Sequence, residues 1–520
     1  MNSQPPEGLR LAELIAALSL ATDLGMGQPM SQALRTCLFA LALGRTLGVS
    51  DRDLADTYYT SLLRCVGCTA DAHDVLDFAN GDDVGLRRTL AGVANGTPDE
   101  VAPHLVRFMT KAGVRGDVGA RVEEALGTRD GIAARSMSAH CEVGAMLAGR
   151  VGLGATVCDA LRHAFERWDG HGFPDGQTGE QVPWAVRLAI LARDIEVLTR
   201  MHGLEGASEV LQTRRGRAHD PSAVDAFIRH GAAIVAEIEA SDAWAEVLRQ
   251  EPGGTAWLSA DQIDEALTAF ADFADVKMPY TLGHSRAVAR LAEAASRDMG
   301  ASDGEVARVR RAALLHDLGR SGISNAIWEH QGALSMEQWE RVRLHAYYTE
   351  RVLACCKYLR PLGTLAGAHH ERLDGSGYHR GSHRTELDRS VRVLAAADAC
   401  QAMLQARPHR AARTLEQTAR ALGDEVSSGR LDGEAVEAVL AAAGAPPRRS
   451  RRSWPGGLTD REVEVLRLMA QGRSNREMSS RLGITPKTAG HHVQHIYDKL
   501  GFSTRAAAAI FALEHGLLDP

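Results

Sequence analysis

Residues 458–508 read LTDREVEVLRLMAQGRSNREMSSRLGITPKTAGHHVQHIYDKLGFSTRAAA. Thr459 and Glu462 form the capping box of a first helix, in which each side chain accepts a backbone N–H that the helix leaves free. Gly483 ends a second helix, and Thr485 followed by Pro486 caps the start of a third. Two short helices joined by a tight Gly-Ile-Thr turn have the geometry of a major-groove reader. The stretch therefore predicts a small helical DNA-binding domain.

The same stretch resembles the LuxR-type helix-turn-helix over its whole length. The resemblance implies base contacts at Gly490, His491 and Gln494, and phosphate contacts at Lys487, Thr488 and Lys499. Because Gly490 has no side chain, base readout is expected to depend on His491 and Gln494. In the family the final helix, here around residues 504–514, pairs two subunits, which implies a homodimer on double-stranded DNA. The alternative is a helical bundle that serves only as an oligomerisation cap.

Charge is distributed unevenly along the chain. The 520 residues carry a net charge of −7, yet residues 446–520 contain twelve Lys/Arg and only seven Asp/Glu. Four arginines lie in the linker PPRRSRRSWPGG at 446–457, where prolines and glycines oppose regular structure. A basic C-terminal part on an acidic body indicates that this end of the chain meets a polyanion.

The remainder of the chain contains an internal repeat. SLLRCVGC at 61–68 aligns with ALLHDLGR at 313–320, and FERWDGHGFP at 165–174 aligns with HERLDGSGYH at 370–379. Apolar residues recur at three- and four-residue spacing in both copies, which predicts helices.

We therefore expect an all-α protein in which two similar helical domains are followed by a four-helix LuxR-type domain. The expected boundaries are 1–250 for the degenerate first copy, 256–445 for the second copy, 446–457 for the linker and 458–520 for the DNA-binding domain.

The second copy carries a set of histidines and aspartates over more than a hundred residues of helical sequence. The set comprises His284, His316, Asp317, His345, His369, His370 and Asp398. Imidazole and carboxylate ligands suit first-row transition metals, and a bridging carboxylate can hold two ions. Two neighbouring ions can assist the displacement of a phosphoester. This pattern predicts a binuclear metal site.

These residues resemble the HD-GYP phosphohydrolases, through the motifs LLHDLGR, HHERLDGSGYH and AAADACQAM. The resemblance covers about residues 256–441 and, through the repeat, implies two HD-domain-like helical domains. It also implies that the seven residues bind two ions, iron or manganese. It further implies that His316 and Asp317 are catalytic, that Asp317 bridges the ions, and that the substrate is cyclic di-GMP or another nucleotide phosphoester. Arg320, Arg407 and Arg410 would hold its phosphate groups, because guanidinium forms charge-assisted hydrogen bonds to phosphate.

Three positions depart from that family pattern. Arg320 replaces the usual lysine after HDxG, and His379 replaces the proline of the GYP signature. Tyr280 lies where some members have a glutamate for a third metal, so two ions are expected.

The first copy has lost most of the corresponding ligands. The aligned residues are Gln32, Arg64, Cys65, His140, Ala164, Phe165 and Asp194. Two potential ligands cannot hold a binuclear centre, so the first copy is predicted to be a pseudo-domain. Its FERWDGHGFP loop is retained either for a regulatory use or only for packing.

Two functional hypotheses follow. The first is a DNA-binding transcriptional regulator that also hydrolyses a nucleotide phosphoester, and the second is a non-catalytic HD-domain ligand sensor coupled to the same DNA-binding domain. The start MNSQPPEGLR resembles no signal peptide, and Arg35 and Arg45 interrupt the most apolar early stretch. These observations predict a cytoplasmic protein without a membrane partner.

Overall fold

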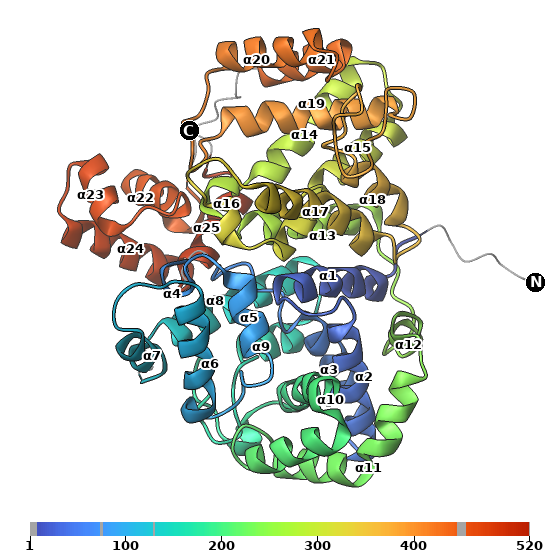
Figure 1. Cartoon of the computed structure of the whole chain (residues 1–520), viewed down its shortest axis with the longest axis vertical. Coiled ribbons are helices and arrows are strands. Elements are labelled where there is room, and N and C mark those ends of the chain that lie inside the picture. Colours follow the sequence, from blue (N-terminus) through green and yellow to red (C-terminus); the bar gives the residue numbers. More distant parts are fainter. Residues whose placement is uncertain (1–7, 73–75, 128–130, 445–453, 519–520) are drawn as a thin grey trace, which may run out of the picture. The chain divides into compact units, whose positions relative to one another are not determined.

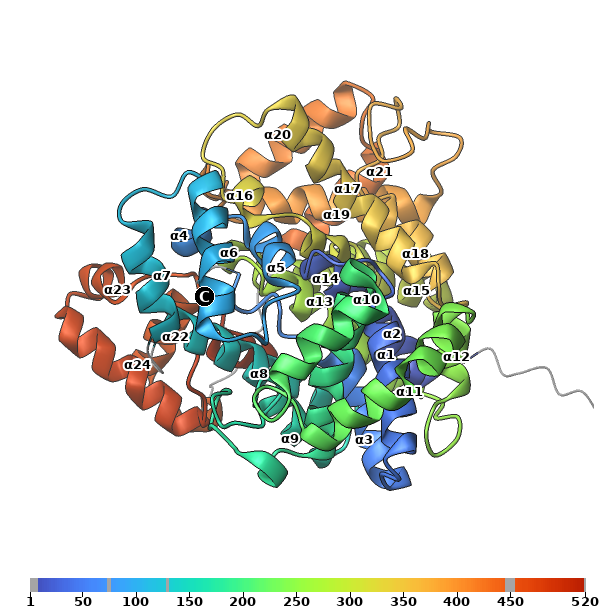
Figure 2. The same ribbon diagram turned by 60° about the horizontal axis from the view of Figure 1, so that its bottom comes forward.

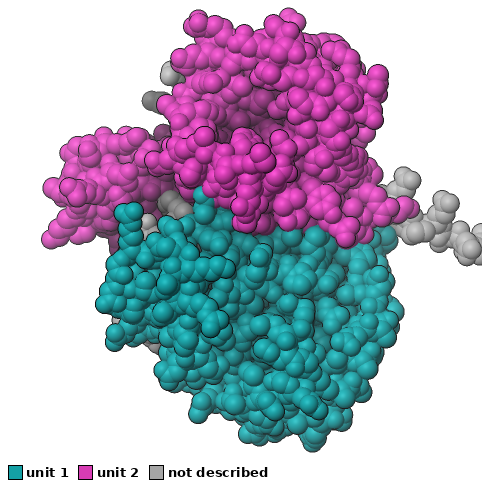
Figure 3. Space-filling model, viewed as in Figure 1, with its two compact units in different colours: residues 1–266, 324–326 teal, residues 267–323, 327–520 magenta. Residues whose placement is uncertain are grey.

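The computed structural model describes residues 8–72, 76–127, 131–444 and 454–518. The described residues form helices joined by loops and isolated bridges, with no β-strand among them, so the all-α prediction is confirmed. The chain divides into two compact units, which are coloured separately in Figure 3. One unit contains residues 1–266 with 324–326, and the other contains residues 267–323 with 327–520.

The first unit contains the helices α1 to α12 and the start of α13 (Figure 1). Their bounds are α1 Leu11–Gly25, α2 Gln32–Thr46, α3 Asp51–Leu63, α4 Leu76–Ala79, α5 Asp83–Leu90, α6 Pro98–Lys111, α7 Val118–Gly127, α8 Ile132–Arg150, α9 Ala155–Arg162, α10 Trp184–Arg214, α11 Pro221–Glu239, α12 Ala243–Arg249 and α13 Ala260–Asp275. Helix α2 packs on α3 and α10, and α8 packs on α9 (Figure 2).

The second unit contains the metal-ligand candidates and the C-terminal helices. The bounds before the linker are α14 His284–Asp298, α15 Asp303–Leu315, α16 Asn325–Trp328, α17 Met336–Leu353, α18 Arg360–Gly367, α19 Arg389–Leu404, α20 Leu415–Ser427 and α21 Gly433–Ala443. After the linker come α22 Asp460–Ala470, α23 Asn475–Leu482, α24 Pro486–Leu500 and α25 Arg505–Glu514. Short 3₁₀ turns lie at Gly179–Gln181, Pro279–Thr281, Leu318–Gly322 and Pro455–Gly457.

The helix boundaries confirm the internal repeat. Helices α2 and α3 begin at residues 32 and 51, and α14 and α15 begin 252 residues later at 284 and 303. The packing is also repeated, because α14 packs on α15 and α19 as α2 packs on α3 and α10. The two copies differ most in the segment that contains α4 to α7 in the first copy, where a separate core gathers around Leu105, Phe108 and Met109.

The C-terminal helices follow the capping signals of the sequence. Thr459 and Glu462 form the capping box of α22, and the Thr485 side chain accepts the N–H of Thr488 at the start of α24. Gly483 and Gly501 end α23 and α24 with φ of +64° and +71°, a conformation that glycine adopts at little cost. Apolar side chains of all four helices share one buried cluster that includes Leu466.

Residues 445–453, which include most of the predicted linker, lie outside the described residues. Within the part of the chain that the structure describes, no helix is both long enough and apolar enough to cross a membrane.

Candidate metal centre and DNA-reading helix

The carboxylate of Asp317 lies between two groups of ligand candidates. On one side, Asp317 Oδ2 is 3.1 Å from His316 Nε2 and 3.7 Å from His284 Nε2. Asp398 completes this group, with its Oδ1 3.1 Å from His284 Nε2 and 3.7 Å from His316 Nε2. All of these side chains are buried. One nitrogen or oxygen atom from each of His284, His316 and Asp398 could therefore reach a single ion.

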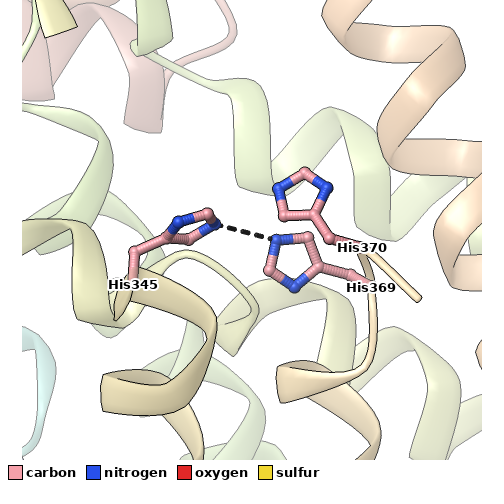
Figure 4. A group of neighbouring side chains, drawn as sticks. All are labelled: His345, His369 and His370. Carbon is pink, nitrogen blue, oxygen red and sulfur yellow. Dashed lines mark hydrogen bonds between the residues drawn. The ribbon is translucent and has the colours of Figure 1, made fainter. Parts of the chain in front are cut away.

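The other oxygen of Asp317 faces a second group. Asp317 Oδ1 is 3.7 Å from the Nε2 atoms of both His345 and His369. Figure 4 shows the ring of His345, on α17, directed at His369 and His370, which follow α18. His345, His369 and His370 form another set whose ligand atoms could share one ion. The structure thus brings together all seven predicted ligands around one central carboxylate.

The imidazole tautomers show that this centre suits cations. The Nδ1 atoms of His316, His345 and His369 each lie against a backbone carbonyl oxygen, so these nitrogens carry the proton and donate it. The Nε2 atoms of His345 and His369 are then left as lone-pair acceptors. His345 Nε2 and His369 Nε2 nevertheless face each other at 3.2 Å, where two lone pairs repel. A metal ion bound by both nitrogens removes that conflict.

A buried carboxylate oxygen without a hydrogen bond gives the same indication. Asp317 Oδ1 is buried and makes no hydrogen bond to any described residue, whereas Asp317 Oδ2 is paired with His316 and Arg320. Such atoms are costly unless a ligand satisfies them. The donor set of five imidazoles and two carboxylates matches transition-metal chemistry, so the residues present fit a metal centre.

Burial keeps most of the imidazoles in the neutral form that can bind a metal ion. Burial lowers the pKa of His284 and of His345 to about 4, so both are neutral near pH 7. For His316 burial also favours the neutral form, but the carboxylates of Asp317 and Asp398 outweigh it and raise the pKa to about 10. A proton on His316 and a metal cation therefore both neutralise the charge of Asp317 and Asp398. Binding of the cation competes with protonation of His316.

Several residues that the sequence did not single out position these ligands. Gln405 Oε1 lies 2.8 Å from His284 Nδ1 and accepts a hydrogen bond from it, which directs His284 Nε2 toward the other ligand candidates. The Asp275 carboxylate accepts the N–H of Ser285 at 2.8 Å and fixes the start of α14. Thr349 Oγ1 donates to the carbonyl of His316 at 3.0 Å. The Gln405 and Thr349 contacts join residues that are 121 and 33 positions apart, so no local pattern could have indicated them.

Gly319 lets the HDLGR segment approach α17 closely. A Cβ atom at residue 319 would lie 2.1 Å from the carbonyl oxygen of His345 and 2.7 Å from the backbone nitrogen of Thr349. The aligned Gly67 of the first copy has the same restriction, because its Cβ would lie 2.1 Å from the carbonyl oxygen of His140. Both copies therefore require glycine at this contact.

We expect Gly319→Ala to push α17 away from the centre and to displace His345. The overpacking should cost roughly 1–3 kcal/mol of unfolding free energy and reduce the bound metal. Thermal unfolding and metal analysis of the purified chain check both effects. Gly423→Ala is the control, since no other atom lies within 4 Å of the added Cβ and alanine favours α20. Unchanged stability and metal content in Gly319→Ala would contradict the expectation.

Of the three predicted phosphate-binding arginines, the structure brings two to the centre. Arg320 is buried and its Nη1 lies 2.7 Å from Asp317 Oδ2. The Arg407 guanidinium lies 5.2 Å from the ring of Tyr280, and burial, followed by the charge of Arg320, lowers the pKa of Arg407 to about 10. Arg410 instead donates to backbone carbonyls at the end of α19 and just after it, including those of Met403 and Gln405. Its position is that of a loop-forming residue.

We expect Arg320→Gln to lower phosphodiesterase turnover roughly 10- to 150-fold, because a charge-assisted contact contributes about 1.5–3 kcal/mol. Arg320→Lys should recover part of that loss, since it keeps the charge but not the planar geometry of the guanidinium. Steady-state kinetics of the two variants, with metal content measured in parallel, provide the check. Equal activity of Arg320→Gln and the unaltered chain would exclude the role.

The loop with the altered GYP signature packs against the centre. The Tyr378 ring lies 4.7 Å from that of His370. His379, which takes the place of proline, lies 3.1 Å from the Glu350 carboxylate of α17. Glu371 accepts the backbone N–H groups of Arg380 and Ser382 and closes the loop. In the first copy, Glu166 of the FERWDGHGFP segment accepts the backbone N–H groups of the three residues that follow it, Asp175, Gly176 and Gln177, which supports retention of that loop for packing.

In the first copy, Arg64 occupies the region that aligns with the metal centre of the second copy. Arg64 donates from Nε to the Ala164 carbonyl at 3.1 Å, and its guanidinium lies 4.6 Å from the Phe165 ring. His140 stacks on Phe165 and is 3.6 Å from the Asp71 carboxylate. Among the described residues, every group that could hold a metal lies in the second copy.

Helix α24 presents a polar face. Lys487, His491 and Gln494 are exposed and lie three or four residues apart on that face. Thr488 is partly exposed, and a Cβ at Gly490 would meet only the Asn475 side chain, at 3.5 Å.

Two of the predicted DNA contacts are engaged within the domain. The Lys499 ammonium lies 2.7 Å from the Glu462 carboxylate and 3.1 Å from the Gly457 carbonyl oxygen. Gln494 donates to Asp498 at 2.8 Å on the same helix. Gln494 is exposed and can rotate toward a base, whereas Lys499 would have to leave two partners.

The helical scaffold and the His-Asp centre define a metal-dependent phosphodiesterase of the HD class. Residues 268–435 match the family described as "HD domain", and residues 457–512 match "Bacterial regulatory proteins, luxR family". The chain is 31% identical over 442 residues to 3'3'-cGAMP-specific phosphodiesterase 3 of Vibrio cholerae, a match that covers 83% of this chain and 94% of the relative. It therefore belongs to the family of HD-domain phosphodiesterases and carries a LuxR-family regulator domain.

A solved structure and a regulator support the two assignments. The crystal structure of a cyclic GMP-AMP specific phosphodiesterase of V. cholerae superposes with a TM-score of 0.59 at 28% identity, over 85% of this chain and 99% of that one. The C-terminal domain is 44% identical over 62 residues to the transcriptional regulatory protein MctR of Rhizobium johnstonii. That match covers 12% of this chain and 29% of MctR.

Proposed function

We propose that the chain hydrolyses a phosphodiester bond of a cyclic dinucleotide at the His-Asp centre. The observation that carries the proposal is the central position of Asp317, whose two oxygens face separate groups of buried ligand atoms. Two transition-metal ions, iron or manganese, would supply Lewis acidity for the displacement when they are bound. The V. cholerae relative named above is a 3'3'-cGAMP-specific phosphodiesterase, and a relative from Thermotoga maritima is a cyclic di-GMP phosphodiesterase.

In this proposal the residues of the centre have three roles: metal binding, phosphate binding and orientation of a ligand. His284, His316 and Asp398 would hold one ion and His345, His369 and His370 the other, with the Asp317 carboxylate within reach of both groups. Arg320 and Arg407 hold the phosphate oxygens and offset the negative charge that develops on them. Gln405 keeps His284 in the ligating tautomer.

A phosphodiesterase assay tests this proposal. Full-length protein, purified anaerobically with iron or manganese supplied, is incubated with 3'3'-cGAMP, cyclic di-GMP and a linear diester. Metal-dependent release of a phosphomonoester is expected for a cyclic dinucleotide. Binding of these ligands without turnover would instead favour a non-catalytic sensor, a function that the pairing of Arg320 with Asp317 would also suit.

We further propose that the C-terminal domain binds double-stranded DNA as a homodimer, with α24 in the major groove. The exposed Lys487, His491 and Gln494 on one face of that helix support this role. DNA binding by the full-length chain should weaken steeply as salt rises, because phosphate contacts release counterions. If nucleotide binding regulates DNA binding, each ligand must change the affinity for the other by the same factor. Affinity for random duplex DNA that is independent of salt would contradict the proposal.

A further inference from the structure

The degenerate first copy contains a narrow, partly enclosed pocket in the region that aligns with the metal centre. Gln32, Arg64 and Cys65, which replace His284, His316 and Asp317, line it together with Thr36 and Ser61. Helices α1, α2, α3 and α10, together with the residues that follow α1 and α3, supply the wall. The loss of the metal ligands has thus left a narrow pocket that contains several polar groups within a largely apolar wall.

Three polar side chains in this pocket have no partner. The amide oxygen of Gln32 and the hydroxyl groups of Thr36 and Ser61 are buried and form no hydrogen bond to any described residue. These side chains are only 6%, 3% and 3% exposed. Buried polar groups usually find partners, so three orphan groups around one space indicate that a polar ligand completes them.

Arg64 gives the pocket its charge. The side chain is 7% exposed, and its contacts are the Ala164 carbonyl and the Phe165 ring; within the described chain no carboxylate forms an ion pair with it. A second guanidinium, that of Arg193, lines the same pocket, and its charge opposes that of Arg64. A buried cation without a counter-ion is costly, so this arrangement favours an anion.

The nearby acids do not neutralise Arg64. Asp194 is engaged by Arg193 at 3.0 Å, by Arg214 at 2.7 Å and by His219 at 3.0 Å. Asp23 also lines the pocket, but burial raises its pKa well above the ordinary value and favours its neutral form, while its carboxyl accepts the N–H of Ala33. The excess positive charge therefore remains at Arg64.

We propose that this pocket binds one phosphate group, as inorganic phosphate or as the phosphomonoester of a nucleotide. The Arg64 guanidinium and the Thr36 and Ser61 hydroxyls donate to the phosphate oxygens, which is the donor set that phosphate prefers. The Gln32 amide oxygen accepts the proton of a P–OH group. Hydrolysis of a phosphodiester generates a phosphomonoester, so the pocket would sense the product class; only this last step rests on the proposed function.

Binding is tested in the full-length chain with Asp317→Asn, which disables the metal centre and leaves the pocket of the first copy unaltered. Inorganic phosphate, 5'-GMP and sulfate are titrated by calorimetry and by thermal unfolding. Phosphate should bind and stabilise the chain, and Arg64→Gln should weaken binding roughly 10- to 150-fold, the loss of one charge-assisted contact. The phosphate affinity of Arg64→Lys should lie between that of the chain with Arg64 and that of Arg64→Gln. Arg45→Gln, an exposed change on α2, is the control and should bind normally.

Each outcome of these titrations either supports or overturns phosphate binding in the pocket. If Arg64→Gln does not fold, Ser61→Ala replaces it, and a roughly 3- to 10-fold loss is expected from one neutral hydrogen bond. Tighter binding of 5'-GMP than of phosphate identifies a nucleotide monoester as the ligand, and the reverse identifies free phosphate. Undiminished phosphate binding in a folded Arg64→Gln chain, equal binding of sulfate, or no phosphate binding at millimolar concentration would overturn the proposal. Because Asp317→Asn is present throughout, none of these results depends on catalysis.

Discussion

Asp317→Asn is expected to remove most of the bound metal and to lower phosphodiesterase activity by about 10³-fold or more. The two oxygens of Asp317 face the two ligand groups, so one substitution weakens both. Metal assistance contributes several kcal/mol to phosphoester displacement, and about 4 kcal/mol corresponds to 10³ in rate. Elemental analysis of the purified chain and initial rates on a cyclic dinucleotide measure the two effects. The double change His316→Ala with Asp317→Ala should behave in the same way.

The internal repeat offers a matched control for this prediction. Cys65 holds the position in the first copy that Asp317 holds in the second. Cys65→Ala should leave both metal content and turnover unchanged, because no described residue near it forms a metal-binding group. If Asp317→Asn kept its metal and its rate, the binuclear centre would be wrong. A parallel loss in Cys65→Ala would indicate a general effect on folding.

The second large effect is expected on DNA recognition by α24. His491→Ala and Gln494→Ala should each weaken binding to the preferred site by roughly 5- to 150-fold, the equivalent of about 1–3 kcal/mol for a base contact. Affinity for unrelated duplexes should change little. Lys487→Ala should instead weaken binding to all sequences and reduce the slope of log K against log salt by about 0.9. Selection of sites from random duplex DNA, followed by titration at several salt concentrations, provides the measurements.

An exposed residue elsewhere in the domain supplies the control for the DNA experiment. Glu464 lies on the surface of α22 and pairs only with Arg461 among the described residues. Glu464→Ala should bind like the unaltered chain. Equal losses on specific and unrelated DNA in His491→Ala and Gln494→Ala would show that these side chains do not read bases. Lys499→Ala is expected to destabilise the domain more than it weakens DNA binding, because its ammonium pairs with Glu462.

Much of the second unit was predictable because its signals are local. The capping box at Thr459 and the proline after Thr485 mark helix starts by contacts within four residues, and the structure places α22 and α24 accordingly. The repeat could be aligned because equivalent helices keep their spacing. The contacts of Arg410 and Lys499 could not be predicted from the sequence. Their side chains reach backbone carbonyls or a partner carboxylate that sequence spacing does not reveal.

The sequence by itself determined the all-α class, the repeated helices and their ends, because residue type and short-range periodicity act within one or two helical turns. The seven imidazole and carboxylate residues of the second copy were assigned from the sequence through its resemblance to the HD-GYP phosphohydrolases. Only the tertiary structure decided which oxygen of Asp317 faces which histidines, that Gln405 orients His284, and that Arg64 lies buried without a carboxylate partner among the described residues. The physical reason is that side-chain direction and burial depend on packing between helices that lie far apart in the chain.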